Sequence, residues 1–168
     1  MLIRAERRDD ANQIQGVVDA AFDSDGERSA ESVLIERLRG SGAWIPQLSL
    51  IAEEGERIVG QCLCTRAHVD DAEVLALGPI SVIPQRQRSG IGSTLMRTAI
   101  EIAIDMSEPL IGLLGDYGYY RRFGFVPASA VGIISPEPSW GDYFQVLVID
   151  ERRAPRGEFV YPTPFRDM

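Results

Sequence analysis

The spacing of apolar and polar positions predicts a strand and two helices at the start of the chain. Leu2 to Arg7 has the pattern of a short strand. Asp9 or Asp10 can cap a helix that runs to about Phe22 and places Ile14, Val17, Val18 and Ala21 on one face. A second helix, from Glu27 to Arg39, buries Val33, Leu34 and Leu38 and ends at Gly40.

Strand patterns then alternate with further helices. The expected strands are 48–53, 57–69, 73–83, 110–114, 125–126 and 143–149, and the first three are joined by short turns. Helices are expected at 91–106 and at 116–123, the latter ending at Gly124. This order predicts a mixed α/β fold whose central sheet is mostly antiparallel, with helices on both faces.

The chain shows no repeat or low-complexity linker, so the sequence predicts one domain spanning 1–168. Its core is expected at about 3–150. Residues 151–168 form a tail, which is punctuated by prolines from Ala154 and is expected to extend over the surface.

Composition narrows the classes of function. The chain has 168 residues, of which 45% are hydrophobic and 25% charged, a balance typical of a globular protein. No apolar run approaches the roughly 20 residues that span a bilayer, and the charged N-terminus is unlike a signal peptide, so cytoplasmic residence is expected. A net charge of −8 disfavours nucleic acid and membrane partners, and it is compatible with a cationic substrate or simply with solubility.

The residues that often hold metals are sparse. Cys62 and Cys64 have no second ligand pair and are expected to be small core residues, and the single histidine, His68, offers no metal cluster. No metal is therefore expected.

A glycine-rich loop between a strand and a helix is the clearest chemical motif. It comprises Gln87, Arg88, Ser89, Gly90, Ile91, Gly92 and Ser93. Glycines let a ligand approach the backbone, and the following helix aims free N–H groups and its positive dipole end at the same place, which suits a phosphate. Ser93 follows Gly92 without a lysine, and Leu95 replaces the third small residue of a dinucleotide loop, so neither of those nucleotide motifs fits. A helix start with flexible glycines remains the alternative.

Gly78 and Pro79 interrupt the strand that precedes this loop. Both residues are disfavoured inside strands, which indicates a β-bulge. Such a bulge would separate the strand from its neighbour and free backbone groups at Ile80, Ser81 and Val82 for a ligand. An irregular edge strand is the alternative.

Together these segments resemble the GCN5-related N-acetyltransferase (GNAT) family. The strand from Leu77 to Pro84, followed by Gln87-Arg88-Ser89-Gly90-Ile91-Gly92, is similar to the family's central motif. Tyr120-Arg121-Arg122-Phe123-Gly124-Phe125 is similar to its Tyr-x-x-x-Gly-Phe motif. Leu114-Gly115-Asp116 and a tail from Gly157 to Phe165 resemble the YhbS-like branch.

The resemblance implies a sheet splayed at its fourth strand and acetyl-CoA as the acyl donor. It implies that backbone amides from Arg88 through Ser93 hold the pyrophosphate, and that Ile80, Ser81 and Val82 pair with the pantetheine arm. Arg86 and Arg88 either touch the 3′-phosphate region or are solvated loop charges.

The resemblance further implies direct transfer of the acetyl group to an amine. Tyr120 would be the general acid for the leaving thiolate, and the Val82 N–H would stabilise the oxyanion. Tyr119 is expected to pack instead. Glu73, His68 and Asp116 are candidate bases by residue type alone, and water can serve in their place. Thr65, Glu53 and Trp44 are candidates for the acceptor pocket, with core or surface roles as the alternative.

Two functions remain open from the sequence. The first is an acetyl-CoA-dependent N-acetyltransferase, whose amine acceptor is a small molecule or a protein. The second is a domain that binds acyl-CoA as a sensor or in an assembly without turnover. A homodimer formed through the apolar last strand and the tail is a further possibility.

Overall fold

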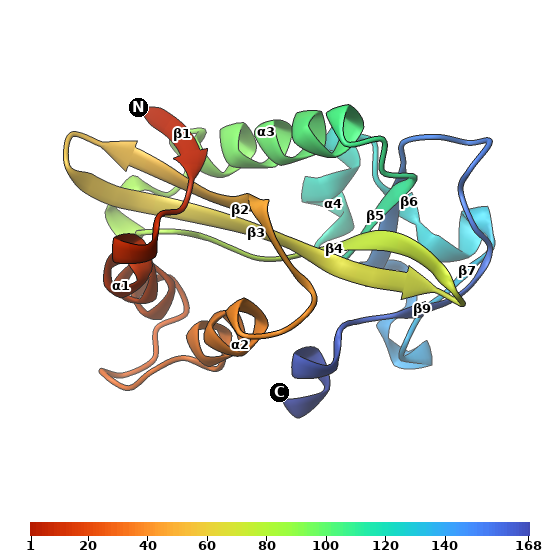
Figure 1. The fold of residues 1–168 in the computed structure, drawn as a ribbon, viewed down its shortest axis with the longest axis horizontal. Coiled ribbons are helices and arrows are strands. Elements are labelled where there is room, and N and C mark those ends of the chain that lie inside the picture. Colours follow the sequence, from red (N-terminus) through yellow and green to blue (C-terminus); the bar gives the residue numbers. More distant parts are fainter.

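A nine-stranded sheet forms the centre of the protein in the computed structural model, which describes all residues 1–168 (Figure 1). The main path has the order β1-β2-β3-β4-β5-β8-β6, while β9 joins both β3 and β7. Along the main path every pair is antiparallel except β4 and β5. The strands are β1 Leu2–Ala5, β2 Trp44–Glu54, β3 Arg57–Val69, β4 Ala72–Val82, β5 Leu110–Leu114, β6 Val126–Pro127, β7 Ile133–Ile134, β8 Phe144–Val148 and β9 Gly157–Val160.

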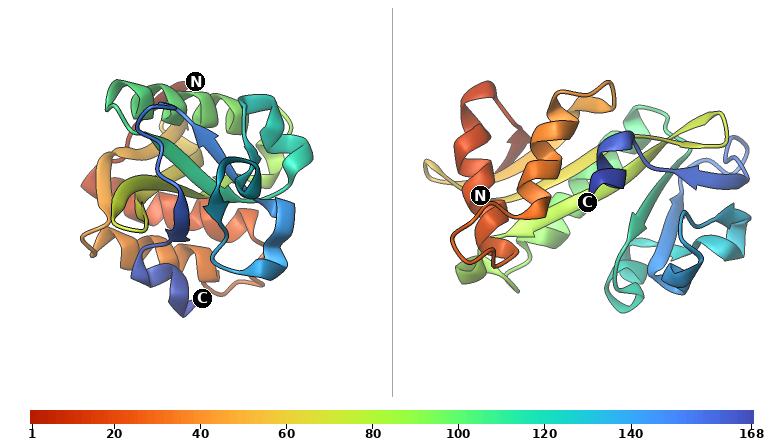
Figure 2. Two further views of the ribbon diagram at one scale, coloured as in Figure 1. Left: turned by 90° about the vertical axis from the view of Figure 1, so that its right-hand side faces the viewer. Right: turned by 90° about the horizontal axis from the view of Figure 1, so that it is seen from below.

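Helices lie on both faces of this sheet. In Figures 1 and 2, α1 and α2 cover one face and α3 covers the other. The α-helices are α1 Ala11–Ala21, α2 Ala30–Arg39, α3 Ile91–Asp105 and α4 Tyr117–Tyr120. Short 3-10 helices are η1 Arg8–Asp10, η2 Pro84–Arg86, η3 Arg121–Phe123, η4 Ala128–Val131, η5 Pro138–Tyr143 and η6 Thr163–Asp167. The predicted mixed sheet with helices on both faces is confirmed.

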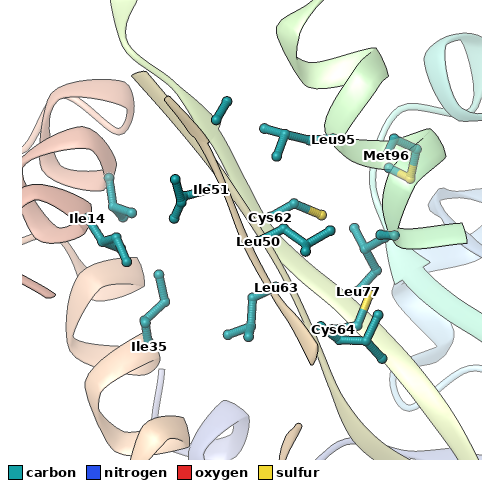
Figure 3. Close-up of a cluster of buried hydrophobic side chains, with 14 of the residues drawn as sticks. Ile14, Ile35, Leu50, Ile51, Cys62, Leu63, Cys64, Leu77, Leu95 and Met96 are labelled. Carbon is teal, nitrogen blue, oxygen red and sulfur yellow. The ribbon is translucent and has the colours of Figure 1, made fainter. Parts of the chain in front are cut away.

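The larger hydrophobic core occupies both sides of the β2–β3–β4 meander. Figure 3 shows Ile14 and Ile35 on the side of α1 and α2, and Leu95 and Met96 of α3 on the other side. Both faces of the central strands are therefore covered, which explains why β3 has an almost continuous buried run rather than alternating exposure. The packing of α3 against β3 fixes the position of the glycine loop that precedes this helix.

The predicted bounds of β3 and β5 match the structure, while α2 begins three residues later than expected. Its start is set by Ser29, whose hydroxyl accepts a hydrogen bond from the Ser32 N–H at 3.1 Å. Asp10 occupies the cap position of α1, but its carboxylate instead binds the Arg4 guanidinium at 2.7 and 3.1 Å. The start of α1 was therefore predicted correctly, whereas the predicted start of α2 was three residues too early.

The tail differs from the expectation of an extended surface segment. Within it, β9 pairs antiparallel with β3 at Val69↔Phe159 and parallel with β7. The Phe159 ring is buried and lies so close to Gly112 of β5 that a Cβ there would be 2.4 Å from the ring. The tail is thus part of a second hydrophobic cluster, together with Phe144 and Val146.

We expect Phe159→Ala to lower the free energy of unfolding by about 3 to 5 kcal/mol, because it removes a buried aromatic ring and leaves a cavity. Ile134→Ala on the adjoining β7 is the control, since Ile134 is 62% exposed and should change stability by less than about 0.5 kcal/mol. Urea unfolding of both variants measures the difference. Equal stabilities would show that the tail does not anchor the fold.

The apolar last strand of the sequence prediction, 143–149, lies inside the sheet. As β8, it lies between β5 and β6 and pairs with both. A homodimer formed through this strand and the tail stays a prediction. None of the helices is long and apolar enough to cross a membrane.

Candidate active site

The parallel strands β4 and β5 separate after only two paired positions. Leu75↔Ile111 and Ala76↔Gly112 are in register, and no pairing continues beyond them. Opposite β3, Cys64 pairs with Leu77 and Cys62 with Ile80, so Gly78 and Pro79 together face one β3 residue. This confirms the predicted bulge, which lies where β4 parts from β5.

The bulge leaves one edge of β4 without a strand partner at Ile80 and Val82. The Ile83 N–H donates to the Val59 carbonyl of β3 at 2.9 Å. Because backbone groups alternate in direction along an antiparallel strand, Ser81 also faces β3, whereas Ile80 and Val82 face the open side. The backbone groups of Ser81 were expected to be free for a ligand, but they face β3. The buried Ser81 hydroxyl accepts a hydrogen bond from the Gln61 side-chain amide at 2.9 Å.

The glycine loop presents unpaired N–H groups beside this edge. Helix α3 begins after Gly90, which has a φ of 90° and provides no side-chain cap. The first hydrogen bond of the helix runs from the Thr94 N–H to the Gly90 carbonyl at 3.0 Å. The N–H groups of Ile91, Gly92 and Ser93 therefore have no partner within the helix, and the helix dipole adds positive potential at the same place.

The preceding loop residues brace the loop. The Gln87 side-chain amide donates to the Val82 carbonyl at 3.0 Å and so ties the loop to β4. The Ser89 hydroxyl donates to the Arg86 carbonyl. Arg86 forms a two-pronged ion pair with Glu54 at 2.7 and 2.8 Å, so its charge is already partnered. Arg88 is exposed and has a φ of 62°.

Tyr120 lies on α4, which begins where the Asp116 carboxylate accepts from the Gly118 N–H at 3.1 Å. Its ring packs against the larger core, and a Cβ on Gly115 would lie 2.4 Å from it. Burial, together with the nearby Cys62 thiol, raises the pKa of the Tyr120 phenol to about 12. The phenol therefore stays protonated at neutral pH, as a proton donor requires.

Tyr119 lies at the glycine loop, which was not expected for a residue predicted to pack. Its hydroxyl is 3.4 Å from the Ser93 hydroxyl, and a Cβ on Gly92 would lie 3.6 Å from it. The same Cβ would lie 3.8 Å from a Val82 methyl group, and the Tyr119 and Tyr120 rings are 4.9 Å apart edge to face. These contacts connect Val82, the loop and Tyr120 in one place. Only the adjacency of the two tyrosines pointed to Tyr119.

The candidate bases lie away from this place or are otherwise engaged. Glu73 precedes Val82 by nine positions on the same strand, roughly 25 to 30 Å away, and its side chain is 71% exposed beside Arg66. His68 pairs across the hairpin with Glu73 at that same distant end. Asp116 is near Tyr120, but its carboxylate caps α4.

Two of the three candidates for the acceptor pocket have structural partners instead. The third, Thr65, is fully buried within the sheet, and its hydroxyl has no hydrogen-bond partner. Glu53 accepts from the Arg4 guanidinium at 3.1 Å, and Trp44 lies under the Arg39 guanidinium at 5.2 Å. Their core or surface roles, the alternatives that the sequence left open, are the ones that the structure supports.

A cavity of about 690 Å³ adjoins the splay, and sequence reasoning missed it. Leu77, Gly78 and Pro79 of the bulge and Leu114 of β5 form one side of it. The remaining wall comes from α2, η5, β9 and the C-terminal residues, which are far apart in the sequence. We call it the acceptor cavity after the role that we propose for it below; its lining on β4 ends at Pro79, the residue before the free edge. The aromatic residues of the tail were the only sequence feature that could have indicated it.

The fold and this arrangement define a member of a known class. Residues 15–125, more than half of the chain, match the model of the Acetyltransferase (GNAT) family. The chain therefore belongs to the GNAT family, as its motifs had indicated.

Two curated relatives of the chain are in Escherichia coli K12. An uncharacterized N-acetyltransferase, YjhQ, is 35% identical over 136 residues, which cover 78% of this chain and 73% of the relative. A second uncharacterized N-acetyltransferase, YhbS, is 28% identical over 149 residues, or 87% of this chain and 86% of the relative. The predicted similarity to the YhbS-like branch is confirmed.

Two solved structures share the fold. A GNAT family acetyltransferase from Brucella melitensis in complex with acetyl-CoA has a TM-score of 0.79 and 34% identity, covering 98% of this chain and 97% of that one. Escherichia coli YhbS in complex with CoA has a TM-score of 0.88 and 24% identity, covering 98% and 91% respectively. The second likeness supports the fold alone.

Proposed function

We propose that this chain is an N-acetyltransferase that moves the acetyl group of acetyl-CoA directly to a primary amine. The unpaired edge of β4 at Ile80 and Val82, beside the free N–H groups of α3, carries the proposal. An open strand edge suits the amides of a pantetheine arm, and a helix N-terminus suits a pyrophosphate. The acetyl-CoA complex of the Brucella relative is consistent with this donor.

The donor would lie across the splay. The N–H groups of Gly92 and Ser93 would hold the pyrophosphate, with Arg88 and Ser89 at the entrance and Gln87 bracing the loop against Val82. The Tyr119 hydroxyl, paired with Ser93, would limit the space above Gly92. The pantetheine arm would then pair with Ile80 and Val82 as an added strand.

The transfer step needs one group that stabilises negative charge on the thioester oxygen and another that stabilises it on the leaving sulfur. The amine nitrogen bonds to the acetyl carbon, and a backbone N–H on the open edge of β4 donates to the oxygen on which negative charge develops. Ile80 is a better placed donor than Val82, because Val82 lies beside the pyrophosphate loop and its N–H would pair with the arm. The carbon–sulfur bond then breaks, and the leaving thiolate takes a proton from Tyr120. The nitrogen loses one proton through water, which restores the phenol, so no side chain is assigned as a dedicated base.

The raised pKa of Tyr120 sets the strength of this acid. A phenol with a pKa of about 12 is a weaker acid than a thiol, whose pKa is about 8.5. Complete proton transfer is therefore unfavourable by roughly three pKa units at the start of the reaction. Tyr120 acts first by donating a hydrogen bond to the developing thiolate, and the proton moves as the amine nitrogen gives up its own.

A pH profile tests this assignment. We expect kcat/KM for the amine to rise from pH 7 to about 10.5, because more of an amine with a pKa near 10 is neutral, with no descending limb. The raised pKa stabilises the fold below the unfolded value of about 10, and this contribution is lost as the pH rises toward 12. Rates are therefore taken below about pH 10.5. A descending limb in this window that disappears in Tyr120→Phe would contradict the raised pKa.

Thiol release from acetyl-CoA separates this enzyme from a domain that only binds acyl-CoA. We expect release that depends on added amine and saturates with it, across at least one member of a broad amine panel. Calorimetry with acetyl-CoA alone provides the matching affinity. Tight binding without amine-dependent release would instead support the sensor.

A further inference from the structure

We propose that the acceptor is a small cationic amine with a flat apolar body, held in the acceptor cavity. This inference rests on the proposed function, since it names the substrate class of the same site. The cavity is bounded by Gly78 and Pro79, immediately before the edge of β4 that would hold the donor's arm. A molecule in the cavity would therefore reach the thioester end of the cleft.

The size of the cavity favours a small molecule over a protein side chain presented on a folded surface. About 690 Å³ lies within the range of 300 to 1,000 Å³ that is usual for small-molecule sites. α2, η5 and the C-terminal residues all contribute to the lining, and Figure 2 shows the C-terminal segment next to α2. η6 packs against α2, so the cavity is enclosed by the tail as well as by the sheet.

The walls are largely aromatic and pre-assembled. The centroid of the Tyr161 ring lies 4.6 Å from that of Phe165 and 6.2 Å from that of Trp140, and all three residues line the cavity. Phe22 and Leu114, also in the lining, are 41% and 45% exposed. Flat aromatic faces bind flat apolar groups well, and exposed apolar side chains gathered in a hollow indicate a ligand that covers them.

The charge of the lining favours a cation. Glu31, Glu137 and Glu158 outnumber the one basic residue, Arg166. None of the three carboxylates forms an ion pair within the chain. They are therefore free to attract an ammonium group, while the aromatic walls hold the apolar body. A polyamine would satisfy the carboxylates but would leave the aromatic faces unused.

Three probes compare these possibilities at saturating acetyl-CoA: tryptamine, spermidine and a short peptide with one internal lysine. We expect kcat/KM for tryptamine to exceed the values for spermidine and the peptide at least tenfold. Equal or faster release with spermidine or the peptide would overturn the inference and leave the proposed function intact. Failure of all three, and of a broader amine panel, would overturn the proposed function itself.

Two sets of variants test the walls and the charges separately. The triple variant Glu31→Gln/Glu137→Gln/Glu158→Gln should raise KM for tryptamine at least tenfold and leave KM for acetyl-CoA unchanged. The control Glu101→Gln, on an exposed position of α3, should change neither.

Phe22→Ala should lower kcat/KM for tryptamine several-fold and spare that for spermidine, with Ile134→Ala as its control. Phe22 is used because Trp140 packs against Phe144 and its removal could unfold the chain. An unchanged KM for tryptamine in the triple variant, or equal losses for both amines in Phe22→Ala, would contradict the cavity as the acceptor site.

Discussion

Replacing Tyr120 with phenylalanine is expected to lower kcat by about 100-fold or more, because general acids contribute roughly 10²- to 10⁴-fold. The substitution removes only the hydroxyl, and the ring keeps its place against Gly115 and Phe125. The affinity for acetyl-CoA should stay within about twofold. Steady-state thiol release and calorimetry measure the two quantities separately.

Two other tyrosines provide the controls. Tyr143→Phe changes an exposed residue and should leave both quantities unaltered. Tyr119→Phe removes the hydroxyl that faces Ser93, so it should weaken acetyl-CoA binding more than it lowers kcat. Unchanged turnover in Tyr120→Phe would remove this residue from the acid role. A loss of affinity equal to the loss of turnover would make it a binding residue instead.

Gly92→Phe is expected to weaken acetyl-CoA binding by about tenfold to a hundredfold. The first side-chain atom at this position would lie 3.6 Å from the Tyr119 hydroxyl and 3.8 Å from Val82, so a ring must extend into the proposed donor site. Displacing the pyrophosphate from one amide would cost roughly 1.5 to 3 kcal/mol, the usual range for hydrogen bonds to charged groups. Calorimetric titration with acetyl-CoA measures the change.

Gly92→Ala is the matched control for this variant. Its Cβ would make only ordinary contacts, and alanine favours a helix over glycine by roughly 0.5 to 1 kcal/mol. The alanine variant should therefore bind acetyl-CoA normally and be at least as stable. Normal affinity in Gly92→Phe, with the fold retained, would show that the loop does not hold the donor.

Local patterns of apolar residues correctly predicted the strands that are buried along most of their length. β3 and β5 were expected with the bounds that the structure gives them, because apolar runs between turn residues are unambiguous there. The bulge at Gly78 and Pro79 was also predictable, since both residue types are rare inside strands. These features depend on residues that are neighbours in the sequence.

The role of the tail could not be predicted in the same way. Gly157–Val160 becomes a strand because β3 and β7 offer it edges, and Phe159 is buried because Gly112 leaves room for its ring. Its prolines indicated only where strand structure would be interrupted. The acceptor cavity depends on the same contacts between residues that are distant in the sequence, so its lining could not be predicted either.

The residues of the candidate site differ in the same way in how well the sequence predicted them. The glycine loop and Tyr120 belong to contiguous motifs, and their positions followed from those motifs. The base candidates were chosen by residue type, which carries no information on distance, and Glu73 lies at the far end of β4. Ser81 was predicted to contact the donor along with Ile80 and Val82, because the sequence does not show which way each backbone group points. That direction depends on the register with β3.

The central claim is that the splay between β4 and β5 brings the donor thioester to Tyr120 and Ile80. A crystal structure of the acetyl-CoA complex tests it most directly. We expect the pyrophosphate within hydrogen-bonding distance of the Gly92 and Ser93 N–H groups, the thioester oxygen at the Ile80 N–H, and the sulfur at the Tyr120 hydroxyl. A donor bound elsewhere, or a thioester directed away from Tyr120 and the acceptor cavity, would contradict the account.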